Sequence, residues 1–243
     1  MDKFKFKNVV IIGGNGAIGN AFVNNLISKD EVKNIFVFSR SSQTYKNPKI
    51  KTSSINLINE NSIKEASIVS SSKGPLDLVI LSTGILHNNI VIPEKSLKEL
   101  SHKKMLEVFL VNTFGPAIVF KYFLPLLTKD KTSVFAALSA RVGSISDNQL
   151  GGWYSYRASK AALNMMIKTA SIEIRRKNQN SILIGLHPGT VKSRLSKPFQ
   201  KNIEKSKLFS PEYSASKLLD IINNLNLDDT GNIIAWDGKK IEA

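Results

Sequence analysis

Three tyrosines of this 243-residue chain are each followed, four positions later, by a lysine, and this spacing can make a phenol reactive. On a helix, residues four apart lie on one face, so the lysine ammonium lies beside the phenol. The ammonium then lowers the pKa of the phenol, and the tyrosine can exchange a proton with a carbonyl or an alcohol. The three pairs are Tyr45–Lys49, Tyr156–Lys160 and Tyr213–Lys217.

The neighbouring residues distinguish the three pairs. The first pair encloses an Asn-Pro dipeptide, which predicts a turn and not a helix. The last pair lies on a predicted helix, 211–225, that buries its apolar side and has only one predicted strand after it. The middle pair begins a long helical pattern, after a predicted strand and a loop rich in serine and glycine. We therefore expect Tyr156 and Lys160 to carry the chemistry.

A glycine-rich turn lies near the N-terminus. The segment GGNGAIG, residues 13–19, follows a short apolar run and precedes a helical pattern. Glycines at such a place let the backbone approach a pyrophosphate, whose charge the N-terminal amides of the helix stabilise. Two glycine spacings fit, G-x-G-x-x-G and G-x-x-x-[GA]-x-G, and both indicate a dinucleotide cofactor. The expected contacts are Gly13, Asn15, Gly16, Ala17, Ile18 and Gly19.

The end of the next predicted strand bears on the choice of cofactor. Proteins that bind NAD usually have an acidic residue there, which binds the ribose hydroxyls. This chain has Ser39 and Arg40 instead. An arginine can pair with a 2′-phosphate, and a serine can hydrogen-bond to it. The sequence therefore favours NADP over NAD.

Apolar predicted strands alternate with predicted helices along the whole chain. This alternation predicts one domain with a parallel sheet of about seven strands and helices on both faces, a doubly wound α/β (Rossmann) fold. The expected strands are 9–12, 35–38, 50–57, 76–81, 133–138, 182–186 and 232–236. The expected helices, besides the one after the glycine-rich turn, are 62–70, 97–127, 154–177 and 211–225.

The composition argues against several other classes of protein. The net charge is +15, but the lysines are scattered and no aromatic-basic motif accompanies them, so nucleic acid is not expected as the ligand. There is no cysteine, and the three histidines lie far apart, so no metal site is expected. The most apolar stretch, 105–127, contains charged residues and prolines, and it predicts a buried helix and no membrane span. The N-terminal apolar run is too short for a signal peptide, so a cytoplasmic protein is expected.

These motifs, in this order, resemble the short-chain dehydrogenase/reductase family over nearly the whole chain. Tyr156 and Lys160 match the family's catalytic pair, and Asn112 matches a helix asparagine that holds a proton-relay water. The segment SARVGSISDNQLGGWYSYRASKAALN is most similar to C-factor-like and sniffer-like carbonyl reductases. The resemblance adds cofactor contacts at the adenine, after the fourth strand and at the nicotinamide. These are Asn56 and Leu57; Ser82, Thr83 and Gly84; and Pro188, Gly189, Thr190 and Val191.

The chain departs from the family at the serine that usually helps to bind the carbonyl oxygen. That serine usually stands three residues before a glycine, and aligned on Gly143 this position is Ala140. Ser139 directly precedes it and Ser144 follows it. Ser139 is the first choice for the serine role, and Ser144 is the second.

The resemblance implies a reaction as well as a fold. It implies hydride transfer between NADPH and a carbonyl or alcohol substrate, with Tyr156 as acid or base, in a homodimer or homotetramer. The polar and basic segment 193–208 is expected to form a mobile lid over the substrate. The alternative is a nucleotide-binding signalling or scaffold protein of C-factor type with little turnover. The sequence identifies neither the substrate nor the direction of the reaction.

Overall fold

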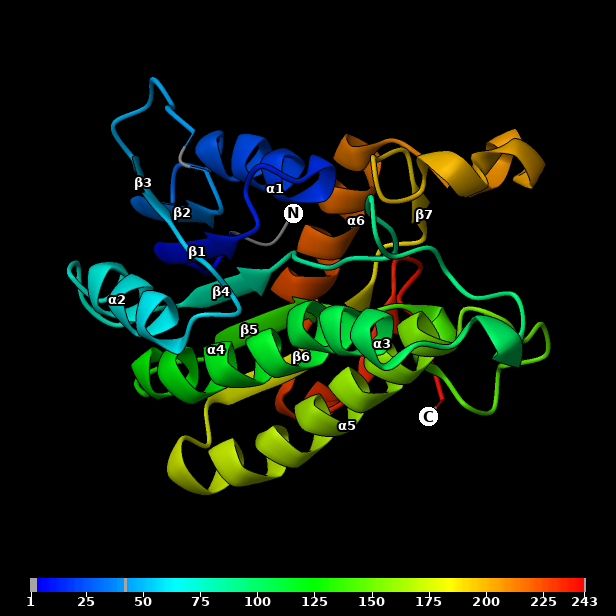
Figure 1. The fold of residues 1–243 in the computed structure, drawn as a ribbon. Coiled ribbons are helices and arrows are strands. Elements are labelled where there is room, and N and C mark those ends of the chain that lie inside the picture. Colours follow the sequence, from blue (N-terminus) through cyan, green and yellow to red (C-terminus); the bar gives the residue numbers. More distant parts are fainter. Residues whose placement is uncertain (1–3, 42, 243) are drawn as a thin grey trace.

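The computed structural model describes residues 4–41 and 43–242, and within them a sheet of seven parallel strands forms the centre of the protein (Figure 1). The strand order is β3-β2-β1-β4-β5-β6-β9, and every neighbouring pair is parallel. The strands are β1 (Asn8–Ile12), β2 (Asn34–Ser39), β3 (Ile50–Ser54), β4 (Leu78–Leu81), β5 (Ser133–Leu138), β6 (Ser181–His187) and β9 (Ile233–Ala235). The predicted doubly wound α/β fold is confirmed.

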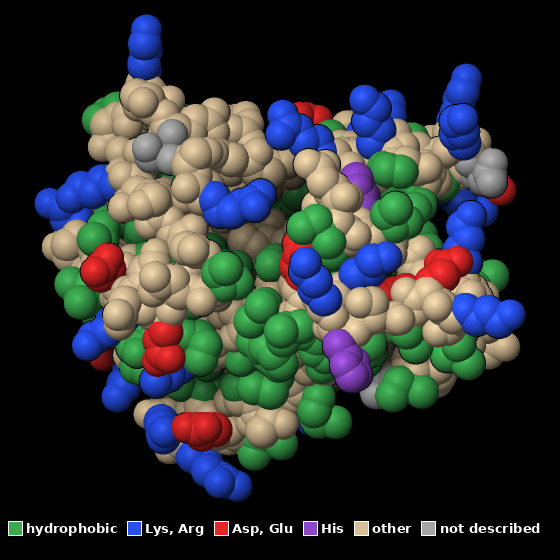
Figure 2. All heavy atoms as spheres, viewed as in Figure 1, with side chains coloured by type: hydrophobic (Ala, Val, Ile, Leu, Met, Phe, Trp, Pro, Cys, Tyr) green, Lys and Arg blue, Asp and Glu red, His purple; other side chains and the backbone are tan. Residues whose placement is uncertain are grey.

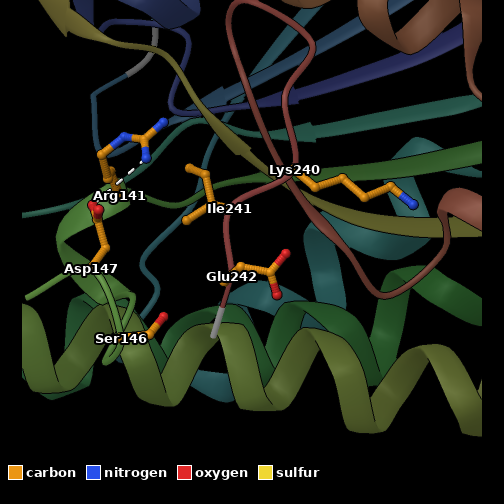
Figure 3. Close-up of a pocket in the computed structure, with 6 residues that line it drawn as sticks. All are labelled: Arg141, Ser146, Asp147, Lys240, Ile241 and Glu242. Atoms are coloured by element: carbon orange, nitrogen blue, oxygen red, sulfur yellow. Dashed lines mark ion pairs between the residues drawn. The ribbon is translucent and has the colours of Figure 1, made fainter.

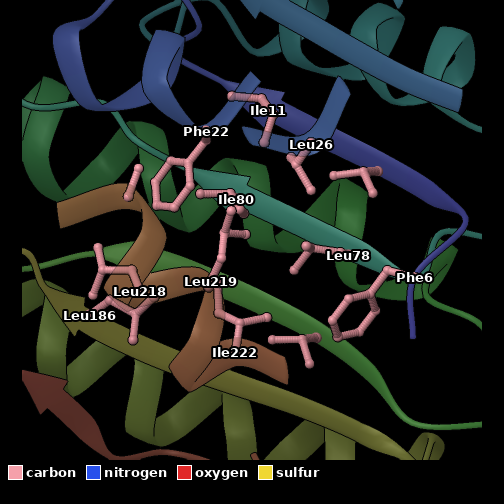
Figure 4. Close-up of a cluster of buried hydrophobic side chains, with 14 of the residues drawn as sticks. Phe6, Ile11, Phe22, Leu26, Leu78, Ile80, Leu186, Leu218, Leu219 and Ile222 are labelled. Atoms are coloured by element: carbon pink, nitrogen blue, oxygen red, sulfur yellow. The ribbon is translucent and has the colours of Figure 1, made fainter. Parts of the chain in front are cut away.

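Helices cover both faces of this sheet. On one face α1 (Ala17–Ile27) packs against α6 (Pro211–Asn224), above a core that Figure 4 shows in part. On the other face lie α2 (Glu60–Ser70), α4 (Gly115–Phe123) and α5 (Tyr154–Lys177), with α3 (His102–Phe109) packed against α5 (Figure 1).

The side chains of each central strand alternate between the two cores. Val9 and Ile11 of β1 belong to the core under α1 and α6, whereas Val10 and Ile12 belong to the opposite core. Successive residues of a strand point to opposite faces of its sheet, so a strand covered on both faces is apolar throughout. The edge strand β3 is more polar and partly exposed. This burial explains why the central strands are short, continuous apolar runs in the sequence.

The parallel arrangement brings the predicted site segments to one edge of the sheet. The glycine-rich turn follows β1, and Ser82, Ser139 and Pro188 follow β4, β5 and β6. The strand order reverses at β1, because β2 and β3 lie on one side of it and β4, β5 and β6 lie on the other. Ligands of open α/β sheets bind beyond the carboxyl ends of the strands, at such a switch point.

The prediction of a single helix over 97–127 is wrong. Leu100 and Ser101 are extended, so α3 begins only at His102. A π-helical turn, Leu110–Phe114, then separates α3 from α4, and the Gly115 amide donates to the Leu110 carbonyl. Pro116 has no amide hydrogen with which to continue the α-helical ladder to the carbonyl of Asn112. The helix therefore widens at Asn112, which is one of the residues predicted to be catalytic.

The stretch His102–Leu126 has the length and composition of a membrane span. It has 25 residues, and the mean hydropathy of its most apolar window is 1.4. Half of that window is buried inside the protein, and a core helix of a soluble protein has the same properties. The stretch is therefore weak evidence for a membrane protein.

Candidate functional site

The glycine-rich turn is closely packed against its neighbours. Gly13 has φ +98°, a conformation that favours glycine, and its amide donates to the Phe38 carbonyl at 2.7 Å. A Cβ on Gly19 would overlap the Gly13 carbonyl oxygen, and one on Gly14 would overlap the Val37 side chain. Helix α1 begins directly after Gly16; among the described residues no side chain caps its first amides, and its first turn contains no acidic residue. These amides are free to bind an anion.

The loop after β2 holds the two residues expected at the cofactor phosphate. The buried Ser39 hydroxyl donates to the Ser41 carbonyl at 2.9 Å, and the Asn15 side chain donates to the same carbonyl at 2.7 Å. Arg40 is exposed, and no other described residue forms an ion pair with it. Of the two candidates, Arg40 is therefore the one whose side chain is available to an incoming phosphate.

The segment after β4 lies between the glycine-rich turn and α5. Ser82 donates from its amide and its hydroxyl to the Ile12 carbonyl, at 2.8 and 2.9 Å. The hydroxyl of Thr83 is buried, and no described residue is its hydrogen-bond partner. A Cβ on Gly84 would lie 3.5 Å from Asn112 Oδ1 and 3.7 Å from Lys160 Nζ. Gly84 therefore lies close to two of the residues predicted to be catalytic.

Asn112 is completely buried in the π-helical turn. Its Oδ1 accepts from the Ile85 amide at 2.8 Å, and its Nδ2 donates to the Ile85 carbonyl at 2.8 Å and to Ser159 Oγ at 3.1 Å. The side chain therefore ties the segment after β4 to α5. The expected contact with a proton-relay water stays a prediction. Because the side-chain amide of Asn112 is already hydrogen-bonded to Ile85 and Ser159, such a water would bind to a main-chain group of this turn.

Tyr156 and Lys160 lie on the buried face of α5. Their side chains are close to each other, with Lys160 Nζ 6.0 Å from the centre of the Tyr156 ring. Lys160 Nζ also donates to the Leu138 carbonyl at 2.9 Å, at the end of β5. Tyr156 is 9% exposed and Lys160 is 3% exposed.

Burial controls the protonation of both groups. It raises the pKa of Tyr156 to about 12 and lowers the pKa of Lys160 to about 8, because each group loses the water that stabilises its charged form. The lowered phenol pKa expected from the sequence is therefore wrong for this arrangement, since burial outweighs the neighbouring ammonium. The phenol keeps its proton at neutral pH, as a proton donor must.

The other two tyrosine–lysine pairs are placed differently. Lys49 donates to the Ile27 and Lys29 carbonyls, at 3.2 and 2.9 Å, and Tyr45 lies outside any helix. Lys217 on α6 does approach the ring of Tyr213, at 5.8 Å, but this tyrosine is 42% exposed. The spacing brings the two side chains together on both helices, and burial sets the middle pair apart.

Both candidate serines have partners inside the protein. Ser139 Oγ donates to Asn164 Oδ1 at 2.5 Å, and Asn164 lies on α5 one turn beyond Lys160. Ser144 Oγ accepts from the Asp147 amide at 3.2 Å. The single proton of the Ser139 hydroxyl is thus directed to Asn164, and the serine role stays a prediction.

An aromatic cluster beside Tyr156 is a feature that the sequence analysis missed. The Trp153 ring lies 6.2 Å from the Tyr156 ring and 4.9 Å from the ring of Phe199, which belongs to the segment expected as a lid. Phe199 also lies 5.8 Å from the ring of His87, whose Nε2 is 3.0 Å from the Arg194 carbonyl. A lone aromatic residue within a polar, basic segment was the available signal for Phe199.

The turn expected at the nicotinamide is anchored from two sides. Gly189 has φ +74°, and a Cβ there would lie 2.6 Å from the Phe209 ring. The Pro188 carbonyl accepts from Ser214 Oγ of α6 at 2.8 Å. The strand β7 (Thr190–Val191) follows directly and pairs with β8 (Leu208–Phe209), so the two ends of the expected lid lie side by side.

A cavity of about 220 Å³ lies beside the loop after β5 (Figure 3). The ion pair between Arg141 and Asp147, 3.6 Å long, borders it on one side, and Ile241 projects from the C-terminal segment on the other (Figure 3). Its lining includes no residue predicted for cofactor binding or catalysis. No group of three or more His, Asp or Glu residues in the described chain could hold a metal ion.

Asn56 and Leu57, expected near the adenine, follow β3. The Asn56 amide donates to Ser62 Oγ at 3.0 Å, and Asn56 Oδ1 accepts from the Ile58 amide at 3.2 Å. Leu57 packs against Gly115, where a Cβ would lie 2.9 Å from the Leu57 Cβ. Leu57 therefore lies against the start of α4, and Asn56 joins the loop after β3 to the first turn of α2.

Comparison with known proteins agrees with this architecture. The family model described as short chain dehydrogenase matches residues 7–204. An oxidoreductase of Schizosaccharomyces pombe is 29% identical, over 94% of each chain, and the C-signal protein of Myxococcus xanthus is 30% identical, over 69% of this chain and 93% of its own.

Solved structures give the same result. The NADPH-bound carbonyl reductase from chicken fatty liver superposes with a TM-score of 0.86 and 25% identity, over 98% of this chain and all of that one. The carbonyl reductase Sniffer of Drosophila melanogaster has the same fold, with a TM-score of 0.85 and 21% identity, over 98% of this chain and all of its own. The chain therefore belongs to the short-chain dehydrogenase/reductase family of oxidoreductases.

Proposed function

We propose that the protein reduces a carbonyl compound with NADPH and that Tyr156 donates the proton. The observation that carries this proposal is the buried Tyr156–Lys160 pair, which lies at the carboxyl end of β5 beside the expected lid. The fold likeness to an NADPH-bound carbonyl reductase supports it.

The residues at the edge of the sheet fit a nicotinamide cofactor. The free amides at the start of α1 suit a pyrophosphate, the exposed Arg40 suits a 2′-phosphate, and the buried Thr83 hydroxyl has no hydrogen-bond partner among the described residues. The segment 188–191 and Lys160 would complete the contacts near the nicotinamide. When bound, the cofactor supplies the hydride.

The protein's own part in the reaction is to place and supply a proton. Tyr156 holds its proton at the phenol oxygen because burial raises its pKa to about 12. As that proton passes to the carbonyl oxygen, the phenol becomes negative, and the ammonium of Lys160 stabilises the charge. The hydrogen bond to the Leu138 carbonyl holds this ammonium in place.

The aromatic cluster supports a class of substrate. Trp153, Phe199 and His87 form a wall beside Tyr156. Such a wall favours a flat or apolar group attached to the carbonyl, because aromatic rings stack on flat groups and exclude water. A substrate panel for this protein should therefore contain aromatic and apolar aldehydes and ketones.

One observation favours a second candidate function, that of a nucleotide-binding signalling or scaffold protein with little turnover. Ala140 occupies the position of the family's serine, and the hydroxyl of Ser139 is bonded to Asn164. Neither residue therefore offers the second hydrogen-bond donor that a substrate carbonyl oxygen usually receives in this family. Absence of NADPH turnover over the whole panel, with NADPH still bound, would favour this alternative.

The protein is also proposed to form a homodimer or homotetramer. Figure 2 shows hydrophobic side chains gathered on the face formed by α3, α4 and α5. The exposed apolar residues of these helices and of the π-helical turn are Leu106, Phe114, Met165, Met166 and Ile172. Exposed apolar surface of this kind usually marks an interface between proteins.

Replacement of Met165 by glutamate should convert the oligomer to monomers, because it places a charge in the apolar face. Light scattering at micromolar concentration would measure the mass. Ile68→Glu, at an exposed apolar position on α2, is the matched control and should leave the mass unchanged. A wild-type protein that is already monomeric would contradict the proposed assembly.

Replacement of Tyr156 by phenylalanine should abolish carbonyl reduction while NADPH still binds, because only the proton donor is lost. Steady-state turnover of NADPH with the substrate panel measures the first effect, and fluorescence titration of NADPH measures the second. Tyr213→Phe is the matched control, since it carries the same spacing on an exposed face, and its turnover should stay within a few-fold of wild type. Turnover that survives in Tyr156→Phe and fails in Tyr213→Phe would reverse the assignment.

Replacement of Arg40 by alanine should weaken NADPH binding by about 1–3 kcal/mol, the scale of a charge-assisted hydrogen bond, and leave NADH binding nearly unchanged. Titration of both cofactors against the wild type and the variant measures the difference. Lys33→Ala, at the other end of β2, removes an exposed cation and should change neither affinity. Equal losses for NADPH and NADH in Arg40→Ala would exclude Arg40 from the phosphate site.

The rate of carbonyl reduction should fall as the pH rises through about 8. Burial lowers the pKa of Lys160 to about 8, so its charge is present below that pH and is lost above it. The Tyr156 phenol stays protonated over the same range, because its pKa is about 12. The pH dependence of kcat/KM between pH 6 and 10 reports these pKa values in the free enzyme. Arginine keeps its charge over this pH range, so the rate of the Lys160→Arg variant should not fall. A fall with the same midpoint in this variant would contradict the assignment of the pH dependence to Lys160.

A further inference from the structure

A buried acid outside the expected catalytic set contacts the helix that carries Tyr156. Glu94 lies in the segment between β4 and α3 and is 2% exposed. Acidic side chains are almost never fully buried unless they have partners. Here Oε2 accepts from the Ser155 amide at 3.1 Å, Oε1 accepts from the Ser155 hydroxyl, and no described lysine or arginine forms an ion pair with it.

The same residue holds the turn that leads into α5. The Glu94 carbonyl accepts from the Trp153 amide at 2.5 Å. Gly151, Gly152 and Trp153 all have left-handed backbone conformations, with φ of +63°, +63° and +53°. A left-handed conformation is unfavourable for a bulky residue such as tryptophan and persists only where the surroundings impose it.

Glu94 supplies from outside the helix the cap that α5 lacks within its own sequence. Trp153 is the cap residue of α5 and offers no side-chain hydrogen bond to the first turn. The carboxylate of Glu94 accepts from the amide of Ser155, the second residue of the helix, where a negative charge also suits the helix dipole. The next residue is Tyr156, and the Trp153 ring contacts the rings of both Tyr156 and Phe199.

We propose that Glu94 is a positioning residue for the reduction: by holding Trp153 and Ser155 it fixes the place of the Tyr156 hydroxyl and of the aromatic wall. The inference rests on the proposed function, since it assigns Glu94 a role in that reaction. A misplacement of about 1 Å at a reacting group can cost about 10²-fold in rate, so a small shift of this turn is sufficient to affect turnover.

The first experiment compares Glu94→Ala with Glu94→Gln in steady-state kinetics. Glutamine can still accept from the Ser155 amide and donate to the Ser155 hydroxyl, so its kcat should stay within about threefold of wild type. Alanine removes both contacts, and its kcat should fall by roughly 10- to 100-fold, while the Kd for NADPH changes by less than about twofold. Glu99→Ala, an exposed acid of the same segment, is the matched control and should leave kcat unchanged.

The second experiment reads the turn without any need for turnover. The chain has two tryptophans, so in a Trp236→Phe background the fluorescence reports on Trp153 alone. Glu94→Ala should shift the Trp153 emission to longer wavelength and increase its quenching by acrylamide, and Glu94→Gln should not. If Glu94→Ala fails to fold, Ser155→Ala, which removes only the bond to the hydroxyl, is measured in its place and should show both effects in weaker form.

The outcomes separate the two proposals. An unchanged kcat in the alanine variant, or an equal loss in kcat and in NADPH binding that glutamine does not restore, overturns the positioning role. If the wild-type protein reduces no carbonyl compound, the proposed function fails, and the Trp153 emission then decides alone whether Glu94 holds the turn. An emission that is the same in all variants overturns the inference in that case.

Discussion

The hydrogen bond from the Lys160 ammonium to the Leu138 carbonyl joins the two elements on which the candidate site is built. A buried ammonium is unfavourable unless it is hydrogen-bonded, so this bond restricts where α5 can lie along the end of β5. Tyr156, one turn earlier on the same face, takes its position from that restriction. The hydrogen bonds from Asn112 and Thr113 to Ser159, and from Ser139 to Asn164, restrict α5 further.

A chain of polar contacts extends from this bond through an otherwise apolar layer. Ser159, next to Lys160, donates to the Tyr156 carbonyl at 2.8 Å and accepts from Asn112. Thr113 donates to the Ser159 carbonyl at 2.9 Å, and Asn112 binds both backbone groups of Ile85. A buried polar network whose members are all bonded is rigid and specifies one packing. These hydrogen bonds therefore fix the π-helical turn, the segment after β4 and α5 relative to one another.

Sequence reasoning was successful where the pattern is local. Apolar runs such as that of β1 and the helical pattern of α5 predicted the sheet and its helices, because burial on both faces leaves a direct mark on composition. The motifs then predicted which loops, at one edge of the sheet, form the candidate site. The widened turn at Asn112 could not be predicted in this way, since it depends on the missing amide of Pro116 and on packing against α5.

Three features of the site depend on tertiary contacts and left no pattern to find. The pKa of Tyr156 rises because the folded protein removes water from it, and spacing to a lysine carries no information on that. The direction of the Ser139 hydroxyl is set by Asn164, which is 25 residues away in the chain. The contact between Trp153 and Phe199 joins the start of α5 to the segment beyond β7.

The short parallel pair of β7 and β8 has a consequence for how the sequence of this protein can vary. The pair brings together the two ends of the segment 192–207, which therefore has the form of an omega loop anchored at its base. The entropy of closing such a loop grows only slowly with its length, so residues can be added or exchanged at its tip at little cost in stability. The base, which carries the turn at 188–191, stays where it is. Changes in this loop can thus arise independently of the residues proposed to bind the cofactor and to transfer the proton.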